Sequence, residues 1–147
     1  MDKKIVNIGY GKVNKVNIGN GLPLAFVGGP CAIETRDHAL FMAEKISKIC
    51  SKVEIPWIYK SCYDKDCRSS PKSFHGVGIE KGLKILSEVR DTFGVPVVSD
   101  FSDPAWAKAT GEVCDMVQVP AYLCRQTSIL RAAAETKRPI LLKKGQF

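Results

Sequence analysis

Residues 95–119, with the sequence VPVVSDFSDPAWAKATGEVCDMVQV, give the clearest indication of the fold. Residues 95–100 and 116–119 are short, mostly apolar runs of the kind found in strands that are buried on both faces of a parallel sheet. Between these runs, Asp103 followed by Pro104 is typical of a helix N-cap with proline at the first helical position. The stretch therefore predicts two parallel strands joined by a right-handed crossover.

Similar units flank this stretch on both sides. Further strands are predicted at residues 24–29, 56–60 and 140–143. Further helices are predicted at residues 36–52, 79–93 and 125–136, where apolar side chains recur at helical spacing. Ahead of all these elements, residues 4–18 alternate in the manner of a β-hairpin, with a turn at Gly11 and Lys12.

We therefore expect an α/β fold in two parts. Residues 1–20 would form an N-terminal β-hairpin, and residues 21–147 a partial TIM-barrel catalytic domain with about the first five strands of a (β/α)8 barrel. A complete barrel typically needs about 250 residues, which is more than the 147 residues of this chain. An open, doubly wound five-stranded sheet is the alternative. No GxGxxG or GxxxxGK loop follows the first parallel strand, which counts against that alternative.

The composition restricts the class of protein. Apolar residues make up 45% of the chain and charged residues 25%, as in soluble globular domains. No apolar run is long enough to cross a bilayer, and no apolar signal core follows the first residues, so we expect a cytoplasmic protein without a membrane partner. Six cysteines lack the CxxC spacing of a zinc ribbon or redox pair, and most are expected to be small apolar residues.

The net charge of +7 would suit either nucleic acid or a small anionic substrate. The basic residues are scattered along the chain, and the tightest group of them, in residues 60–72, lacks the interleaved aromatic residues of a strand-binding surface. A pocket for phosphate is therefore the better interpretation, and nucleic acid is not expected as a partner.

Polar residues stand at the end of nearly every predicted parallel strand: Lys60, Asp100, Gln118 and Lys143. In a closed barrel, the C-terminal ends of the strands and the loops that follow them form the active face. Charged and amide side chains at these positions therefore predict an enzyme.

Four motifs at these strand ends resemble the 3-deoxy-D-manno-octulosonate 8-phosphate synthases. They are GGPCAIE at 28–34, Lys60 with KDCRSS at 65–70, QVPAYLCRQT at 118–127, and KKGQF at 143–147. Their order and spacing hold from about Leu24 to the last residue. The resemblance implies a transferase of lipopolysaccharide precursor synthesis, which condenses phosphoenolpyruvate with arabinose 5-phosphate to give 3-deoxy-D-manno-octulosonate 8-phosphate and phosphate.

The resemblance also implies roles for individual residues. Lys60, Lys65 and Asp100 would be catalytic, and the residues that would bind phosphoenolpyruvate are Lys60, Lys65, Lys143, Gln118 and the backbone of Ala121. Arg68 and Ser69 would hold the phosphate of arabinose 5-phosphate, since the planar guanidinium pairs two oxygens at once. Arg125 would reach the same phosphate from a neighbouring subunit, which implies a homo-oligomer, a tetramer in the family. The alternative for any one of these lysines is a solvated surface charge, which is the usual position of lysine, but three lysines at corresponding strand ends make this alternative poorer. The alternative for Arg125 is an ordinary salt bridge at the start of a helix.

Cys31 corresponds to a metal ligand in one branch of these synthases. The resemblance implies that its thiolate binds a divalent metal, possible ions being Zn, Fe or Mn, together with His, Glu and Asp from later strands. His38 and His75 match no ligand of the family. A lone thiolate does not build a selective site, so a buried, inert Cys31 is the alternative for this chain.

Three positions depart from the family pattern, and two other functions stay open. Cys67 stands where asparagine usually contacts the sugar, Ser102 where histidine is usual, and His75 where arginine is usual.

One alternative function is that of the related 3-deoxy-arabino-heptulosonate 7-phosphate synthase, which uses erythrose 4-phosphate, although its Lys-Pro-Arg-Thr loop differs from the KDCR of residues 65–68. The other is an inactive half barrel that acts only through self-association or a partner.

Overall fold

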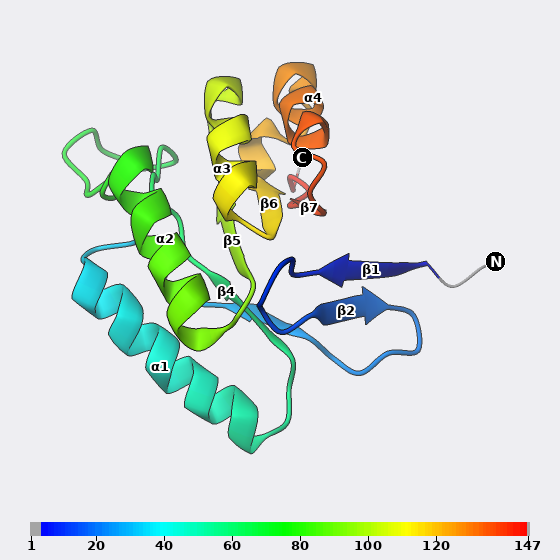
Figure 1. Cartoon of the computed structure of the whole chain (residues 1–147). Coiled ribbons are helices and arrows are strands. Elements are labelled where there is room, and N and C mark those ends of the chain that lie inside the picture. Colours follow the sequence, from blue (N-terminus) through cyan, green and yellow to red (C-terminus); the bar gives the residue numbers. More distant parts are fainter. Residues whose placement is uncertain (1–3, 147) are drawn as a thin grey trace.

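The computed structural model describes residues 4–146 and contains two separate sheets (Figure 1). Residues 1–3 and 147, which belong to the predicted segments 1–20 and 21–147, lie outside the described residues. The first sheet is an antiparallel hairpin of β1 (Ile5–Ile8) and β2 (Val16–Gly19). The predicted hairpin is therefore confirmed for the residues described.

The second sheet is parallel, and its strand order is the order of the chain: β3 (Phe26–Gly28), β4 (Trp57–Lys60), β5 (Val97–Asp100), β6 (Met116–Val119) and β7 (Ile140–Leu142). A doubly wound sheet reverses its strand order at a switch point, whereas this sheet winds in one direction only. It forms a curled half barrel, consistent with the first five strands of a TIM barrel, so the doubly wound alternative is wrong.

Within residues 4–146, an α-helix follows each of β3 to β6: α1 (Arg36–Lys52), α2 (Ile79–Phe93), α3 (Ala107–Val113) and α4 (Thr127–Glu135). Short 3-10 turns, η1 (Pro104–Trp106) and η2 (Ala121–Leu123), precede α3 and α4. The side chain of Asp103 accepts a hydrogen bond from the backbone N of Ala105, which confirms the predicted N-cap, although the cap opens η1 rather than α3 directly. No helix in residues 4–146 is long and apolar enough to span a membrane.

The two faces of the parallel sheet pack against different elements. On the outer face, Tyr59, Val97 and Val117 belong to the large core that the helices cover. On the inner face, Ile58, Val98 and Met116 pack against residues of the hairpin, Ile8 and Val16. The hairpin therefore closes the bottom of the half barrel, as Figure 1 shows where β1 and β2 lie beside the sheet.

The outermost strand β3 departs from one prediction. Residues 24–29 were expected to form a strand buried on both faces, yet Leu24 is 77% exposed and Phe26 is 43% exposed. The reason is that β3 pairs only with β4 and stands at the edge of the described sheet. The burial predicted for this strand is wrong, although the strand itself is confirmed at Phe26–Gly28.

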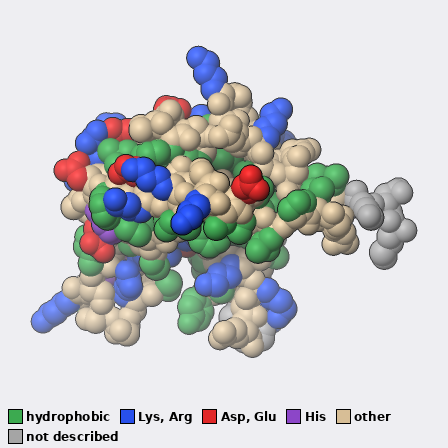
Figure 2. All heavy atoms as spheres, turned by 90° about the horizontal axis from the view of Figure 1, so that it is seen from below, with side chains coloured by type: hydrophobic (Ala, Val, Ile, Leu, Met, Phe, Trp, Pro, Cys, Tyr) green, Lys and Arg blue, Asp and Glu red, His purple; other side chains and the backbone are tan. Residues whose placement is uncertain are grey.

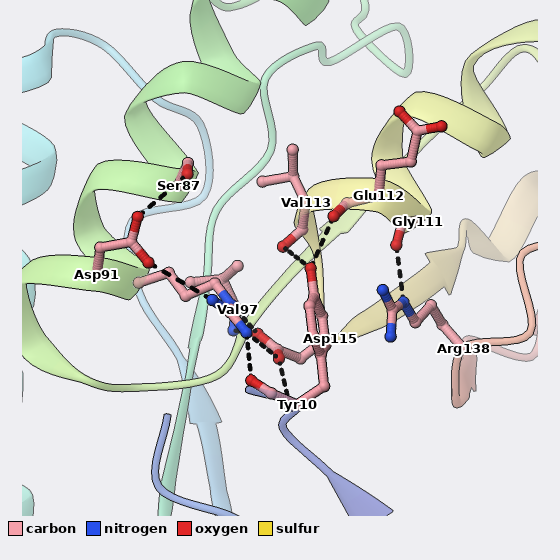
Figure 3. A network of polar contacts seen from close by, with 10 residues as sticks. Tyr10, Ser87, Asp91, Val97, Gly111, Glu112, Val113, Asp115 and Arg138 are labelled. Carbon is pink, nitrogen blue, oxygen red and sulfur yellow. Dashed lines mark hydrogen bonds and ion pairs between the residues drawn. The ribbon is translucent and has the colours of Figure 1, made fainter. Parts of the chain in front are cut away.

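A buried polar network fixes the hairpin to the lower end of the sheet (Figure 3). The carboxylate of Asp115, which follows α3, accepts hydrogen bonds from the backbone N of Tyr10 at 3.0 Å and from Nε of Arg90 at 3.0 Å. The ring of Tyr10 lies between two guanidinium groups, with its centroid 4.2 Å from Cζ of Arg90 and 3.7 Å from Cζ of Arg138. These contacts join the hairpin, α2 and the segments around β6 and β7.

Candidate active site

A cavity of about 540 Å³ opens at the C-terminal ends of β4, β5 and β6. Its walls come from the loops after these three strands, and the lining residues are Asp64, Lys65, Asp66, Cys67, Arg68, Ser69, Asp100, Phe101, Ser102, Pro120, Tyr122 and Leu123. This is the end of the sheet at which barrel enzymes place their chemistry.

The alternation of side chains along the strands explains why the predicted residues meet here. Successive residues of a strand point to opposite faces, so residues two apart share a face. Ile58, Val98 and Met116 face the interior of the half barrel. The residues two positions later, Lys60, Asp100 and Gln118, therefore face the interior as well, one step nearer to the C-terminal ends. The interior of the half barrel thus has an apolar layer of side chains and, nearer to the C-terminal ends of the strands, a polar layer.

Asp100 is the centre of this polar layer. Its Oδ2 accepts a hydrogen bond from Nζ of Lys65 at 3.4 Å and a longer one from Nε2 of Gln118 at 3.5 Å. The side chains of Lys65 and Asp100 are only 12% and 11% exposed, so their ion pair is shielded from water. Oδ1 of Asp100 is buried without a hydrogen-bond partner among the described residues. One acceptor in the site therefore has no partner among the described residues.

Two lysines gather around the thiol of Cys62. Nζ of Lys60 donates a hydrogen bond to Sγ of Cys62 at 2.9 Å. Burial lowers the pKa of Lys65, but the nearby Cys62, Asp100 and Cys31 outweigh burial and raise this pKa overall, so the side chain stays cationic. Burial, followed by the charge of Asp100, raises the pKa of the fully buried Cys62 thiol. The structure therefore holds two cations and one carboxylate around a neutral sulfur.

The loop after β4 supplies a second basic position. Arg68 and Ser69 are exposed and line the cavity, and within residues 4–146 the guanidinium of Arg68 makes no hydrogen bond or ion pair. Cys67 lines the same wall. Ser102, across the cavity, donates a hydrogen bond to Oδ2 of Asp64 at 3.4 Å. A free guanidinium facing a cavity suits an anionic group with several oxygens.

Three predicted residues lie at the same edge of the sheet but neither line the cavity nor contact Asp100 or Cys62. Ala121 begins η2, between two lining residues. Arg125 is exposed just before α4. The backbone N of Lys143 donates to the carbonyl of Val119 at 3.1 Å, which places Lys143 just beyond β7, but its ammonium makes no hydrogen bond or ion pair within the described part of the chain. The structure thus joins Lys60, Lys65, Asp100 and Gln118 and leaves these three at the periphery.

Comparison with known proteins identifies the family. Residues 5–147 match the DAHP synthetase I family. The chain belongs to this family. The 2-dehydro-3-deoxyphosphooctonate aldolase of Rickettsia rickettsii (strain Sheila Smith) is 54% identical over 136 residues, which are 92% of this chain and 50% of that protein. The protein of the same name from Rickettsia prowazekii (strain Madrid E) is 49% identical over 145 residues, 99% of this chain and 51% of that protein.

The chain spans about half the length of the curated relatives it matches. Their name is a synonym of 3-deoxy-D-manno-octulosonate 8-phosphate synthase, so the resemblance drawn from the four strand-end motifs is confirmed. The relatives are named as enzymes, which confirms the prediction of an enzyme from the polar residues at the strand ends. The heptulosonate synthase alternative is not favoured by these relatives.

The metal site predicted for this family member is only partly represented. Cys31 follows β3 and is exposed, so the burial that the alternative assumed for this cysteine is not observed. Its carbonyl accepts a hydrogen bond from the backbone N of Cys62 at 3.3 Å. Within residues 4–146, no three His, Cys, Asp or Glu side chains gather in a way that could hold a metal ion. The described residues therefore offer one cysteine sulfur and do not by themselves fit a divalent metal.

Sequence reasoning missed Cys62, which it treated as one of several small apolar cysteines. The available signal was its position, two residues after Lys60 and three before Lys65. In an extended backbone, residues two apart point to the same side, so Cys62 is expected to lie near Lys60. The backbone is extended at Cys62, which forms a parallel bridge with Ala32.

On the face of the molecule that Figure 2 shows, the basic side chains do not form a comparable cluster. Figure 2 shows the Lys and Arg side chains of this face scattered among hydrophobic and acidic ones. The cationic groups that meet at short range are instead those at the C-terminal strand ends.

Proposed function

We propose that this chain provides the first half of the active site of a 3-deoxy-D-manno-octulosonate 8-phosphate synthase. In this reaction, C3 of phosphoenolpyruvate attacks the aldehyde carbon of arabinose 5-phosphate, water adds at C2, and phosphate leaves with cleavage of its C–O bond. The observation that carries the proposal is the convergence of Lys60, Lys65, Asp100 and Gln118 at the carboxyl ends of adjacent strands.

Each of these groups has a task that its surroundings support. Phosphoenolpyruvate carries a carboxylate and a phosphate, and Lys60 and Lys65 offer two ammonium groups beside one sulfur for them. Fixed cations in a shielded site stabilise charge that develops in a transition state more than mobile water does. Asp100 orients Lys65 through their ion pair at 3.4 Å. Gln118, Ala121 and Lys143 would contribute further contacts to the same substrate.

The sugar phosphate would bind at the other wall of the cavity. Among the described residues, the guanidinium of Arg68 has no partner there, and Ser69 lines the same cavity. Arg125 is exposed and would act on the sugar phosphate of a neighbouring subunit, so we propose a homo-oligomer, a tetramer as in the family. Light scattering of the purified protein tests this part. We also propose that the enzyme works in the cytoplasm, where its six free cysteines would stay reduced.

We further propose that Cys31 is this chain's contribution to a divalent metal site, with the other ligands supplied from outside residues 4–146. A bound Zn, Fe or Mn ion would supply Lewis-acid polarisation of the aldehyde or of the water. Titration of the complete protein with cobalt tests the ligand directly: thiolate coordination gives a sulfur-to-metal absorption band. If Cys31→Ser leaves that band unchanged, Cys31 is not a ligand.

A chimera tests the reaction itself. This chain replaces the matching half of the Rickettsia rickettsii relative, which is 54% identical over that part. We expect release of phosphate from phosphoenolpyruvate that depends on arabinose 5-phosphate and on a divalent metal, and that is much slower with erythrose 4-phosphate. Arg68→Lys in the chimera should raise the KM for the sugar phosphate, because an ammonium cannot pair two oxygens at once. Phosphate release that is absent, or independent of the sugar, would refute the proposal.

A further inference from the structure

Cys62 occupies a position that the backbone fixes independently of its side chain. Cys62 pairs with Ala32 in a parallel bridge. In this bridge, the backbone N of Cys62 donates to the carbonyl of Cys31 at 3.3 Å, and the carbonyl of Cys62 accepts from the backbone N of Ile33 at 2.9 Å. Cys62 is fully buried. Replacing the thiol therefore leaves both backbone hydrogen bonds of this bridge in place.

The sulfur stands between charged groups rather than among apolar ones. Nζ of Lys60 lies 2.9 Å from Sγ of Cys62, and Nζ of Lys65 lies 3.4 Å from Oδ2 of Asp100, a carboxylate that contributes to the raised pKa of the Cys62 thiol. Two ammonium groups repel each other, and the repulsion is strong where water is excluded. Asp100 pairs with Lys65, whereas the contact that Lys60 makes is to Cys62. Without an acceptor at position 62, Lys60 would have no described partner to hold it near Lys65.

We propose that Cys62 is a positioning residue, whose thiol holds the Lys60 ammonium group near the Lys65 ammonium group that Asp100 holds, so that both reach one phosphoenolpyruvate molecule. The identity of the ligand rests on the proposed function. The neutral thiol suits this role because its lone pairs accept N–H groups without cancelling their charge. A carboxylate in the same place would neutralise one of the cations that the anionic substrate needs.

Another cysteine provides a matched control. Cys114 is also fully buried, and it packs in the main core between the helices and the sheet. Burial raises the pKa of its thiol to about 12, and it has no lysine beside it among the described residues. Cys114→Ala therefore removes a buried sulfur of equal size without touching the lysines.

The experiment compares Cys62→Ala, Cys62→Ser and Cys114→Ala, both in the chain itself and in the chimera, with phosphoenolpyruvate and inorganic phosphate as the probes. Far-ultraviolet circular dichroism first establishes that each variant is folded. Loss of a hydrogen bond to a charged group should weaken phosphoenolpyruvate binding, measured by titration calorimetry, by about ten- to a hundredfold in Cys62→Ala. Cys62→Ser keeps an acceptor and should recover most of the affinity, and Cys114→Ala should bind as the unmodified protein does.

In the chimera, the KM values of the two substrates distinguish a positioning role from a general effect on packing. Cys62→Ala should raise the KM for phosphoenolpyruvate and leave the KM for the sugar phosphate unchanged. Equal binding by Cys62→Ala and the unmodified protein would overturn the proposal, and so would a failure of Cys62→Ser to recover affinity. If the unmodified protein binds inorganic phosphate but not phosphoenolpyruvate, and Cys62→Ala weakens phosphate binding, the proposed reaction fails while the positioning role holds. If the unmodified protein binds neither anion, the positioning role fails as well.

Discussion

Replacement of Asp115 by alanine should remove a large part of the stability of the fold. Its carboxylate is fully buried and accepts hydrogen bonds from Nε and Nη2 of Arg90 at 3.0 and 3.1 Å, and from the backbone N of Tyr10 and of Val97, each at 3.0 Å. Asp115→Ala leaves a guanidinium that is only 12% exposed without its carboxylate. It also leaves two backbone N–H groups without their acceptor (Figure 3).

The expected loss follows from these contacts. Removal of one partner of a buried ion pair costs about 3–5 kcal/mol, because the remaining charge stays buried without compensation. Each backbone N–H left unsatisfied would cost about 1–3 kcal/mol taken alone. The terms overlap, since Nη2 of Arg90 keeps its hydrogen bond to the carbonyl of Tyr10 and water can enter the space. We therefore expect a net loss of about 3–5 kcal/mol from a domain stability that is typically about 5–15 kcal/mol.

Chemical denaturation, followed by tryptophan fluorescence and circular dichroism, measures this loss. The matched control is Asp91→Ala, which removes a second carboxylate from the same Arg90, one that is 69% exposed and 3.5 Å away. That variant should lose less than about 1 kcal/mol, as exposed ion pairs usually do. A free energy of unfolding of Asp115→Ala within about 1 kcal/mol of the unmodified protein would refute the claim that this network fastens the hairpin to the sheet.

Three further substitutions probe other parts of the fold. Burial raises the pKa of Tyr59 to about 12 from an ordinary value of 10.0. The stability that the neutral phenol of Tyr59 contributes is therefore complete below pH 10.0 and is lost as the pH rises through about 12. Tyr59→Phe should lessen this loss of stability in unfolding curves measured across this pH range. Gly82→Ala would place Cβ 2.1 Å from Cβ of Tyr63, so denaturation should show a loss of about 1–3 kcal/mol, and unchanged stability would contradict this packing. Arg36→Ala breaks an exposed pair with Glu88 and should leave the midpoint of thermal unfolding essentially unchanged.

Much of the parallel sheet was predictable because each strand and helix has its own local pattern. The predicted bounds of the helix at Arg36–Lys52 and of the strand at Met116–Val119 are those observed. The helix predicted at residues 79–93 is also observed with these bounds, whereas α4 begins at Thr127 rather than at residue 125, because η2 and an extended Gln126 precede it. The convergence of Lys60, Asp100 and Gln118 followed from the rule that parallel strands end at the same edge.

Other features depend on long-range packing that no local pattern carries. The sequence does not reveal which strand stands at an edge, so the exposure of Leu24 and Phe26 was not foreseen. The network around Asp115 joins residues about 105 positions apart, from Tyr10 to Asp115, and no spacing rule connects them. The contact of Cys62 with Lys60 required the path of the backbone after β4, which extends the sheet by the bridge to Ala32.

The inner face of the half barrel shows how a cationic site is made compatible with a stable fold. Ile58, Val98 and Met116 form its lower layer, and the hairpin covers this layer with Ile8 and Val16. Lys60, Asp100 and Gln118 stand one pleat higher, which is about 7 Å along a strand. The hairpin therefore shields this side of the charged layer from water. Because the effective dielectric falls where water is excluded on one side, an anion that enters the cavity meets stronger attraction from the lysines than it would at an open surface. The network at Asp115 keeps the hairpin in place and so maintains this one-sided exposure, although it touches none of the residues in the site.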